Sequence, residues 1–308
     1  MLFRDAAAEW FEEYKQDREL RTVCIADELL RVHILPFWGE MDMRNITHDA
    51  IQAFAVSLSQ HGPSAVYPQG LTRPSIRRDI SILRRIFDRE IHQGNVVSNP
   101  ATGISLKGLP IRSREVMIFT PDEVTLLIRS ARPRWFADLL ILAYRTGMRR
   151  GELYGLRWED VDLNLERLYV RRSISCPYAG MRIEKEPKTP SSRRTILLDG
   201  TTVSMLAQRK ADWGQSSPWV IVNAHGQAPS PWDTTRLMNK ACIAAGLQPR
   251  GIHTLRHTHA SILLSKGVYI KTVQQRLGHA SISTTLQTYA HALVEMQKEA
   301  VGIFDSLS

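Results

Sequence analysis

The chain has 308 residues, 43% of them hydrophobic, and a formal net charge of +9 at neutral pH. This length favours two domains, because single hydrophobic cores stop growing near about 250 residues. No apolar run approaches the roughly 18–20 residues that cross a bilayer, and the acidic N-terminal residues are unlike a signal peptide. The composition excludes a membrane protein, and we expect a cytoplasmic one.

Positive charge is unevenly distributed along the chain. Residues 1–50 carry six Lys and Arg against eleven Asp and Glu, whereas residues 111–308 carry 27 against 17. Such a surplus suits a polyanionic partner, because neutralising phosphates releases counterions, although many basic proteins simply have solvated faces. The three cysteines are scattered and odd in number, which argues against a disulfide framework or a four-cysteine zinc site.

Residues 1–108 predict an all-α domain. Apolar residues recur at spacings of three and four over residues 2–17 and 25–35, which is typical of amphipathic helices. A third helix is expected over residues 47–60, with Thr47 as its N-cap. No part of this region shows the convincing alternation of a strand.

A fourth helix, expected over residues 74–93, carries an apolar row and many arginines. The apolar residues fall on one face and predict core packing: Ile76, Ile80, Leu83, Phe87 and Ile91. The arginines lie elsewhere around the helix, either as a solvated face or as phosphate contacts. Five of them are the candidate contacts: Arg73, Arg77, Arg78, Arg84 and Arg85.

Residues 109–115 predict a basic linker, because prolines and glycines interrupt the helical pattern around them. Arg112 and Arg114 make this stretch positive, and together with Lys107 just before it they are further candidate phosphate contacts. A basic linker between two such domains would let the pair close around a duplex.

Residues 116–308 predict a mixed α+β domain. Thr120-Pro121 starts a helix, and further helices are expected over residues 135–144 and from about Met148 to Trp158. Apolar alternation between residues 167 and 198 then predicts three short antiparallel strands. Helices resume at five positions: about Thr201, Thr234, His253, Ile270 and Ser283. The fold class is therefore mainly α, with a helical first domain and a small antiparallel sheet in the second.

Two helix starts in this second domain carry candidate site residues. His253 and Arg256 are three residues apart, so both reach one side of the first turn of a helix. Arg149 also lies at a helix start, where Glu152 would hold its guanidinium as a supporting residue.

Three further candidates lie in turns or late in the chain. Gly278 is expected to end a helix in the left-handed conformation, which would fix His279 in a tight turn. Lys188 lies in a proline-bounded turn between two strands, and Tyr289 lies nearly two turns into the helix that starts near Ser283. A lone histidine or tyrosine is more often structural, so the argument rests on the whole set.

This set of side chains suits attack on a phosphodiester. Two arginines can straddle the non-bridging oxygens of a phosphate and hold the charge that develops there. A tyrosine with a pKa of about 10 needs nearby cations or a base to act as a nucleophile, and Lys188 could protonate the leaving oxygen. The alternative that His253, His257 and His259 bind a metal lacks a Glu between the first two and an evident third ligand.

Five sequence boxes carry a family resemblance: T-G-M-R-R-G-E-L from residue 146, P-K-T-P-S-S-R from 187, H-T-L-R-H-T from 253, L-G-H-A-S from 277 and T-Y-A-H from 288. In order, spacing and type they resemble the signature boxes of the tyrosine recombinases, the phage-integrase family. The resemblance covers about residues 115–300, and residues 1–110 are similar only in outline, as a helical core-DNA-binding domain. Many phage integrases have an additional N-terminal domain. The two expected domains leave no residues for it in this sequence, so we expect a simpler recombinase or a shortened integrase.

The resemblance implies roles for the candidate residues. Six match the family's catalytic positions: Arg149, Lys188, His253, Arg256, His279 and the nucleophile Tyr289. The implied reaction is site-specific recombination through a 3′-phosphotyrosyl link and a free 5′-hydroxyl, without metal or other cofactor.

The resemblance also implies partners. They are double-stranded DNA with inverted-repeat recombination sites, further copies of the chain in a tetramer on that DNA, and host accessory proteins. The chain would then be associated with the nucleoid in the cytoplasm. An apolar stripe near the C-terminus would serve the contact between subunits: Leu293, Met296, Val301, Ile303 and Phe304.

Two other functions remain open at this point. A type IB topoisomerase would use the same chemistry as a monomer, and the C-terminal stripe argues against it. A DNA-binding regulator with a decayed site would lack activity, and the intact set of six residues argues against that.

Overall fold

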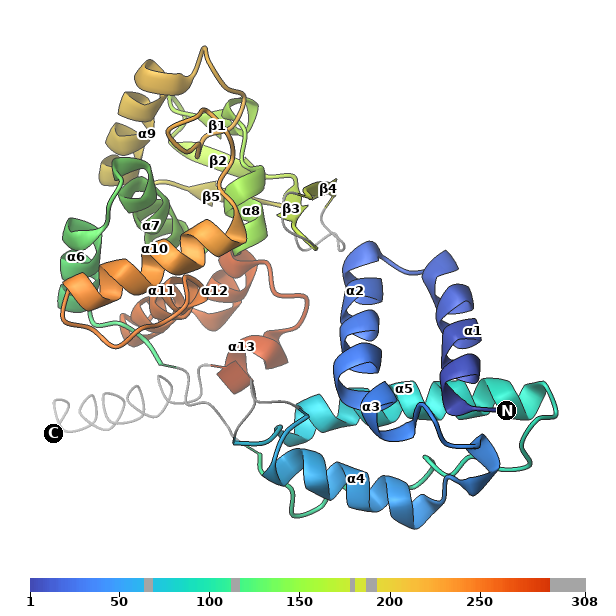
Figure 1. Ribbon diagram of the computed structural model, residues 1–308. Coiled ribbons are helices and arrows are strands. Elements are labelled where there is room, and N and C mark those ends of the chain that lie inside the picture. The colour runs from blue at the N-terminus through green and yellow to red at the C-terminus, as the bar shows by residue number, and fades with distance from the viewer. Residues whose placement is uncertain (64–68, 112–116, 178–180, 187–192, 289–308) are drawn as a thin grey trace, which may run out of the picture. The chain divides into compact units, whose positions relative to one another are not determined.

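The computed structural model describes residues 1–63, 69–111, 117–177, 181–186 and 193–288 (Figure 1). It divides into two compact units, residues 1–114 and 115–308. The predicted fold class, mainly helical with a small antiparallel sheet in the second half, is confirmed. The exact domain boundaries and the basic linker stay predictions, since residues 112–116 lie outside the described residues.

The first unit is helical in its described residues. Its elements are α1 (Phe3–Gln16), α2 (Leu20–Glu28), the π-helical turn η1 (Leu29–Ile34), α3 (Leu35–Trp38), the 3-10 turn η2 (Met43–Asn45), α4 (His48–Gln60) and α5 (Arg73–His92). The predicted N-cap is present, because the Thr47 hydroxyl accepts from the Ala50 N–H at 3.2 Å. Helix α5 packs against α1, η1 and α4, so it forms the centre of this unit.

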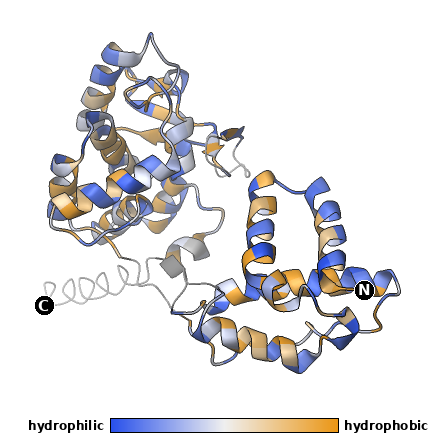
Figure 2. Cartoon of the chain, in the orientation of Figure 1, coloured by the Kyte–Doolittle hydropathy of each residue, from blue (hydrophilic) through white to orange (hydrophobic). Residues whose placement is uncertain are grey.

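Helix α5 separates apolar from positive side chains, as predicted. Hydrophobic and hydrophilic residues are interleaved along its length (Figure 2). Four residues of the predicted apolar row are buried, and Ile91 is half-buried. Arg77, Arg78, Arg84 and Arg85 are exposed, whereas Arg73 is half-buried and Lys107 in the following loop is exposed.

One arginine of α5 has a structural role within the unit. Arg89 is only 14% exposed and forms ion pairs with Glu9 and Glu13 of α1 and with Glu90. It therefore fastens α1 to α5 and is not a candidate phosphate contact.

The second unit has helices around two small sheets. Its elements are α6 (Pro121–Ser130), α7 (Arg134–Thr146), α8 (Arg150–Gly155), the 3-10 turn η3 (Trp158–Asp160), β1 (Val161–Asp162), β2 (Arg167–Val170), β3 (Ser173–Ser175), β4 (Ile183–Lys185), β5 (Arg194–Leu197), α9 (Gly200–Trp213), α10 (Pro231–Ala244), α11 (His253–Ser265), α12 (Ile270–Leu277) and α13 (Ile282–Thr288).

The three predicted strands are present as β2, β4 and β5, but the prediction missed β1 and β3. The described residues form an antiparallel sheet in the order β1-β2-β5 and a separate pair, β3-β4. Leu168 of β2 pairs with Ile196 of β5, and both are buried, whereas Ile183 of β4 pairs with Ser175 of β3. A strand of Ser-Ile-Ser has only one apolar residue, so periodicity could not reveal β3.

Two predicted helix boundaries also need correction. Helix α10 begins at Pro231, earlier than predicted, because the Ser230 hydroxyl accepts from the Asp233 N–H at 3.1 Å and serves as the N-cap. The helix after Met148 ends at Gly155, and Trp158 belongs to the separate turn η3. In contrast, the predicted start at Thr120-Pro121 is confirmed, with a complete capping box.

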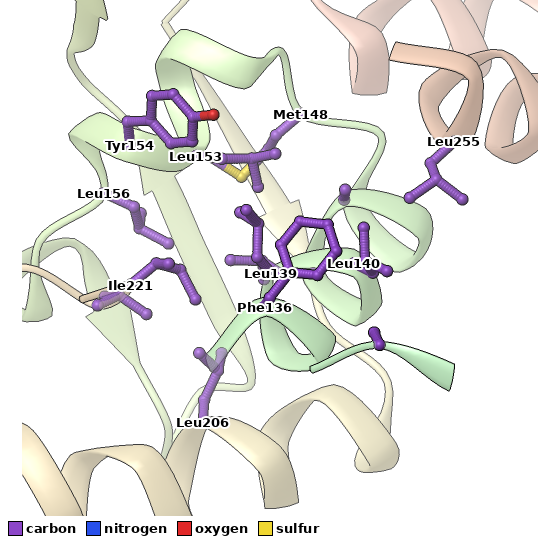
Figure 3. Packing of buried hydrophobic residues seen from close by; sticks show 14 of the residues in the cluster. Phe136, Leu139, Leu140, Met148, Leu153, Tyr154, Leu156, Leu206, Ile221 and Leu255 are labelled. Atoms are coloured by element: carbon purple, nitrogen blue, oxygen red, sulfur yellow. The ribbon is translucent and has the colours of Figure 1, made fainter. Parts of the chain in front are cut away.

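The core of the second unit lies between α7, α8, α11 and the larger sheet. Phe136, Leu139 and Leu140 of α7 meet residues of α8, of α9 and of the chain that follows it (Figure 3). Leu255 of α11 packs into the same cluster and is fully buried. This core holds the N-terminal turn of α11 beside the turn between α7 and α8.

The turn between α7 and α8 depends on Gly147. Its φ of 65° lies in the left-handed region, and an added Cβ would lie 2.7 Å from the His259 ring and 2.9 Å from Leu277. Gly246 has a similar φ of 70°, but an added Cβ there would meet nothing within 4 Å. The two glycines therefore share the backbone constraint and differ in packing.

Gly147→Ala should destabilise the second unit more than Gly246→Ala. Both variants place alanine in the left-handed region, which costs roughly 1–2 kcal/mol. Only Gly147→Ala also overpacks a buried ring, for about 1–3 kcal/mol more. Urea unfolding of the full chain, followed by tryptophan fluorescence, measures both losses. Equal losses would contradict the packing described here.

Candidate active site

The C-terminal end of α12 is held by three arginines. Gly278 caps this helix in the left-handed conformation, with φ 66°, as predicted. The carbonyl groups of the three successive residues 276–278 each accept a hydrogen bond from a different guanidinium. The donors are Arg194 Nε at 2.6 Å, Arg256 Nη2 at 2.7 Å and Arg149 Nη2 at 2.7 Å, in that order.

These arginines come from three separate elements. Arg149 is the N-cap residue of α8, Arg194 is the first residue of β5, and Arg256 lies in the first turn of α11. Arg256 also donates to the Gly147 carbonyl at 2.6 Å and is 2% exposed. Cations are stabilised at a helix C-terminus, because the unpaired carbonyl groups there carry partial negative charge.

Glu152 joins two of the three arginines. Its Oε1 accepts from Arg149 Nη1 at 2.9 Å, the contact that the spacing of three residues predicts. Arg194 donates to Oε1 at 3.1 Å and to Oε2 at 2.8 Å. Burial opposes ionisation of Glu152, but the hydrogen bonds and charge of Arg194 and the charge of Arg149 outweigh it and lower the pKa of Glu152. One carboxylate charge thus stands against three guanidinium charges, so the net charge of the site is positive.

His279 is fixed in the turn that follows α12. Its backbone N–H donates to the Gln274 carbonyl at 3.2 Å, and the Gln274 amide donates to the His279 carbonyl at 2.7 Å. Its Nδ1 lies 2.8 Å from the hydroxyl of Thr285 in α13. Burial, followed by the charges of Arg256 and Arg149, lowers the pKa of His279 to about 4. His279 is therefore neutral at physiological pH.

His253 lies at the rim of the same region. Its ring packs edge-on against His257, with ring centroids 4.8 Å apart. Partial burial and then the charges of His257 and Arg256 lower the pKa of His253. It also lines a pocket of about 390 Å³ beside Arg150 and Asn239. His253 is thus a neutral imidazole that faces a pocket.

The sequence reasoning missed a contact between buried His259 of α11 and half-buried Arg276 of α12. His259 Nδ1 lies 2.8 Å from the Tyr144 carbonyl, and the Arg276 Nε–H donates to His259 Nε2 at 3.1 Å. Arg276 Nη2 lies 3.1 Å from the carbonyl groups of Arg145 and Leu197, so it links α12 to α7 and β5. No spacing in the sequence indicates these contacts.

Both ring nitrogens of His259 are therefore occupied by protein groups, which argues against the alternative of a histidine metal site. Among the residues that the structure describes, no group of three or more His, Cys, Asp or Glu side chains is arranged to hold a metal ion. Within the same residues, no helix combines the length and apolar character that a bilayer crossing requires.

The structure brings together Arg149, Arg256, His279 and the supporting Glu152, with His253 at the rim. Lys188 and Tyr289 lie outside the described residues, as do Arg112, Arg114 and the C-terminal stripe. A guanidinium has five N–H donors. Arg149 uses two of them in its contacts with Glu152 and the Gly278 carbonyl, and its side chain is 37% exposed. The region can therefore bind an anion such as a phosphate.

Sequence comparison places the chain among known proteins. The pattern of the phage integrase family matches residues 118–296, and that of the phage integrase N-terminal SAM-like domain matches residues 2–59. A tyrosine recombinase XerC-like protein of Caldanaerobacter subterraneus is 28% identical over 267 residues, 79% of this chain and 68% of that protein. The ICEBs1 integrase of Bacillus subtilis is 27% identical over 292 residues, 91% of this chain and 76% of that protein.

Structural comparison agrees with the sequence comparison. The fold is similar to that of the Tn1549 transposon integrase in complex with transposon right end DNA, with a TM-score of 0.78. The likeness covers 97% of this chain and 98% of that chain at 19% identity, which supports a shared fold.

The rings of His259 and His279 should remain neutral well below the pH at which an exposed histidine protonates, because the structure lowers the pKa of each to about 4. An exposed histidine has a pKa of about 6.5, so the unfolded chain binds more protons than the folded chain between these values, and stability should rise with pH across that window. An NMR titration of histidine-labelled protein measures each ring directly. A pKa near 6.5 for both rings would contradict the described burial.

Proposed function

The chain belongs to the phage integrase family, and from this premise we propose that it recombines DNA at specific sites through a 3′-phosphotyrosyl intermediate. Cleavage and rejoining of DNA is the activity of the family. The observation that carries the proposal is the convergence of Arg149, Arg256 and His279 on one turn. That turn leads into α13, which ends at Thr288, the residue before Tyr289.

In the proposed mechanism, Arg149 and Arg256 bind the scissile phosphate. Their guanidinium planes are fixed by the Gly278 and Leu277 carbonyl groups, so little reorganisation is needed when DNA binds. Donors that are already aimed at the non-bridging oxygens stabilise the charge of the five-coordinate phosphorus. The neutral imidazoles of His253 and His279 can donate a hydrogen bond or accept a proton at the same phosphate.

The covalent step uses the two residues outside the described part of the chain. The Tyr289 oxygen attacks phosphorus, forming the tyrosyl–phosphate bond, and the bond from phosphorus to the 5′-oxygen breaks. The phenol proton passes to a neutral histidine, and Lys188 gives a proton to the leaving 5′-oxygen. The 5′-hydroxyl of a partner strand then reverses the step, so bond energy is retained and no ATP is consumed.

The partner in this proposal is double-stranded DNA with inverted-repeat sites, bound by a tetramer. The exposed arginines Arg77, Arg78, Arg84 and Arg85 of α5 and the exposed Lys107 would contact phosphates from the first unit. Half-buried Arg73 and the linker residues Arg112 and Arg114 would add to this contact. Strand exchange requires pairs of sites to be cut together, which is the physical reason for a tetramer.

Tyr289→Phe should bind DNA as well as the unaltered chain but form no covalent adduct, because phenylalanine lacks the attacking oxygen. A nicked suicide substrate, from which the cleaved strand diffuses away, traps the adduct for gel electrophoresis. Tyr269→Phe is the matched control, because Tyr269 is 71% exposed at the start of α12 and should leave adduct formation unchanged. Adduct formation by Tyr289→Phe would refute the nucleophile assignment.

Lys188→Ala should lose cleavage of ordinary DNA by about 10²–10⁴-fold, the usual contribution of a positioned general acid. It should cleave a substrate with sulfur in place of the 5′-bridging oxygen at close to the unaltered rate, because a thiolate leaves without a proton. Lys185→Ala in β4 is the control, with both substrates cleaved normally. A sulfur substrate that fails to rescue Lys188→Ala would show that Lys188 is not the proton donor.

A further inference from the structure

We propose that Arg194 is a positioning residue for this reaction, an inference that rests on the proposed recombinase function. Its side chain is 6% exposed, and its Nε, Nη1 and Nη2 atoms all donate to protein groups, the Arg276 carbonyl and the Glu152 carboxylate. It sits at the start of β5, on the strand that follows the segment containing Lys188. It would act through the groups that it holds.

One planar guanidinium connects two parts of the site. Its Nη1 and Nη2 atoms donate to both carboxylate oxygens of Glu152, at 3.1 and 2.8 Å. Its Nε donates to the Arg276 carbonyl at 2.6 Å. The bidentate pair fixes the plane of the carboxylate, and the third bond fixes the last turn of α12 relative to that plane. Arg194 thereby sets the distance between α8 and the end of α12.

Both of these partners lead directly to catalytic candidates. Glu152 accepts from the Arg149 backbone N–H at 2.8 Å and from its Nη1 at 2.9 Å, so a shift of the carboxylate would move the Arg149 guanidinium. The Arg276 carbonyl is three residues before His279, within the turn whose next two carbonyl groups face Arg256 and Arg149. A loosened α12 terminus would therefore displace His279 and both phosphate-binding arginines.

Lysine cannot reproduce this arrangement. An ammonium group is a point charge that cannot bind both carboxylate oxygens in one plane while also reaching a backbone carbonyl. Arg194→Lys keeps the charge beside buried Glu152 and so limits the loss of stability, whereas Arg194→Met removes the charge as well. Comparing the two variants therefore separates the effect of losing the bidentate hydrogen bonds from the effect of losing the positive charge.

Arg193 provides a matched control on the adjoining position. Its side chain is 60% exposed and pairs with exposed Glu186. Arg193 precedes the first residue of β5 and its guanidinium pairs with Glu186, not with Glu152, so Arg193→Gln leaves the Glu152 contacts intact.

The test is single-turnover adduct formation by the full chain on a nicked suicide substrate, at DNA concentrations that saturate binding. Arg194→Lys and Arg194→Met should slow adduct formation by about ten- to hundredfold, the scale of a misplacement of about 1 Å. DNA affinity by gel shift should change less than about threefold, since phosphate contacts elsewhere supply it. Arg193→Gln should react at the unaltered rate.

A double-mutant cycle distinguishes positioning from a purely structural role. Because Arg194 acts partly by orienting Arg149, the combined variant Arg194→Lys/Arg149→Lys should be slowed by less than the product of the two single losses. Multiplied losses in the cycle, or normal rates in both Arg194 variants, would overturn the inference while leaving the proposed function intact. If the unaltered chain formed no adduct, the proposed function would fail, and this inference with it.

Discussion

The site depends on the interaction between the C-terminal carbonyl groups of α12 and three arginines. An isolated guanidinium in a protein interior is costly, and three close together repel one another. Here each one donates to a carbonyl at the negative end of a helix, and Glu152 pairs with two of them. The helix terminus and one carboxylate therefore allow positive charge to accumulate at a defined place before any anion binds.

The same charge explains the state of the histidines. A protonated ring at His279 would face Arg149, Arg256 and Arg194, so burial and these charges keep it neutral. A bound phosphate would supply the negative charge that the cluster lacks, and the interaction would be strongest at the five-coordinate stage, when charge on the oxygens is greatest. Packing then completes the arrangement, since Gly147 allows His259 and Leu277 to approach the turn at which Arg256 donates.

Local signals in the sequence predicted much of this structure. The Arg149–Glu152 contact, the left-handed Gly278 and the helix start at Thr120 all depend on residues within one helical turn. Contacts across long separations were out of reach: Arg194 meets Glu152 over 42 residues, and His259 meets Tyr144 over 115. Strands β1 and β3 were missed for a different reason, because elements of two and three residues with one apolar side chain each show no period.

In the mechanism that we propose, Arg149 and Arg256 keep their carbonyl contacts while they bind the scissile phosphate. A structure of the chain trapped on nicked DNA measures this directly. We predict phosphorus bonded to the Tyr289 oxygen, Arg149 and Arg256 within hydrogen-bond distance of its non-bridging oxygens, and both arginines still donating to the Gly278 and Leu277 carbonyl groups. Phosphorus bonded to another residue, or guanidinium groups that have left the end of α12, would contradict the account.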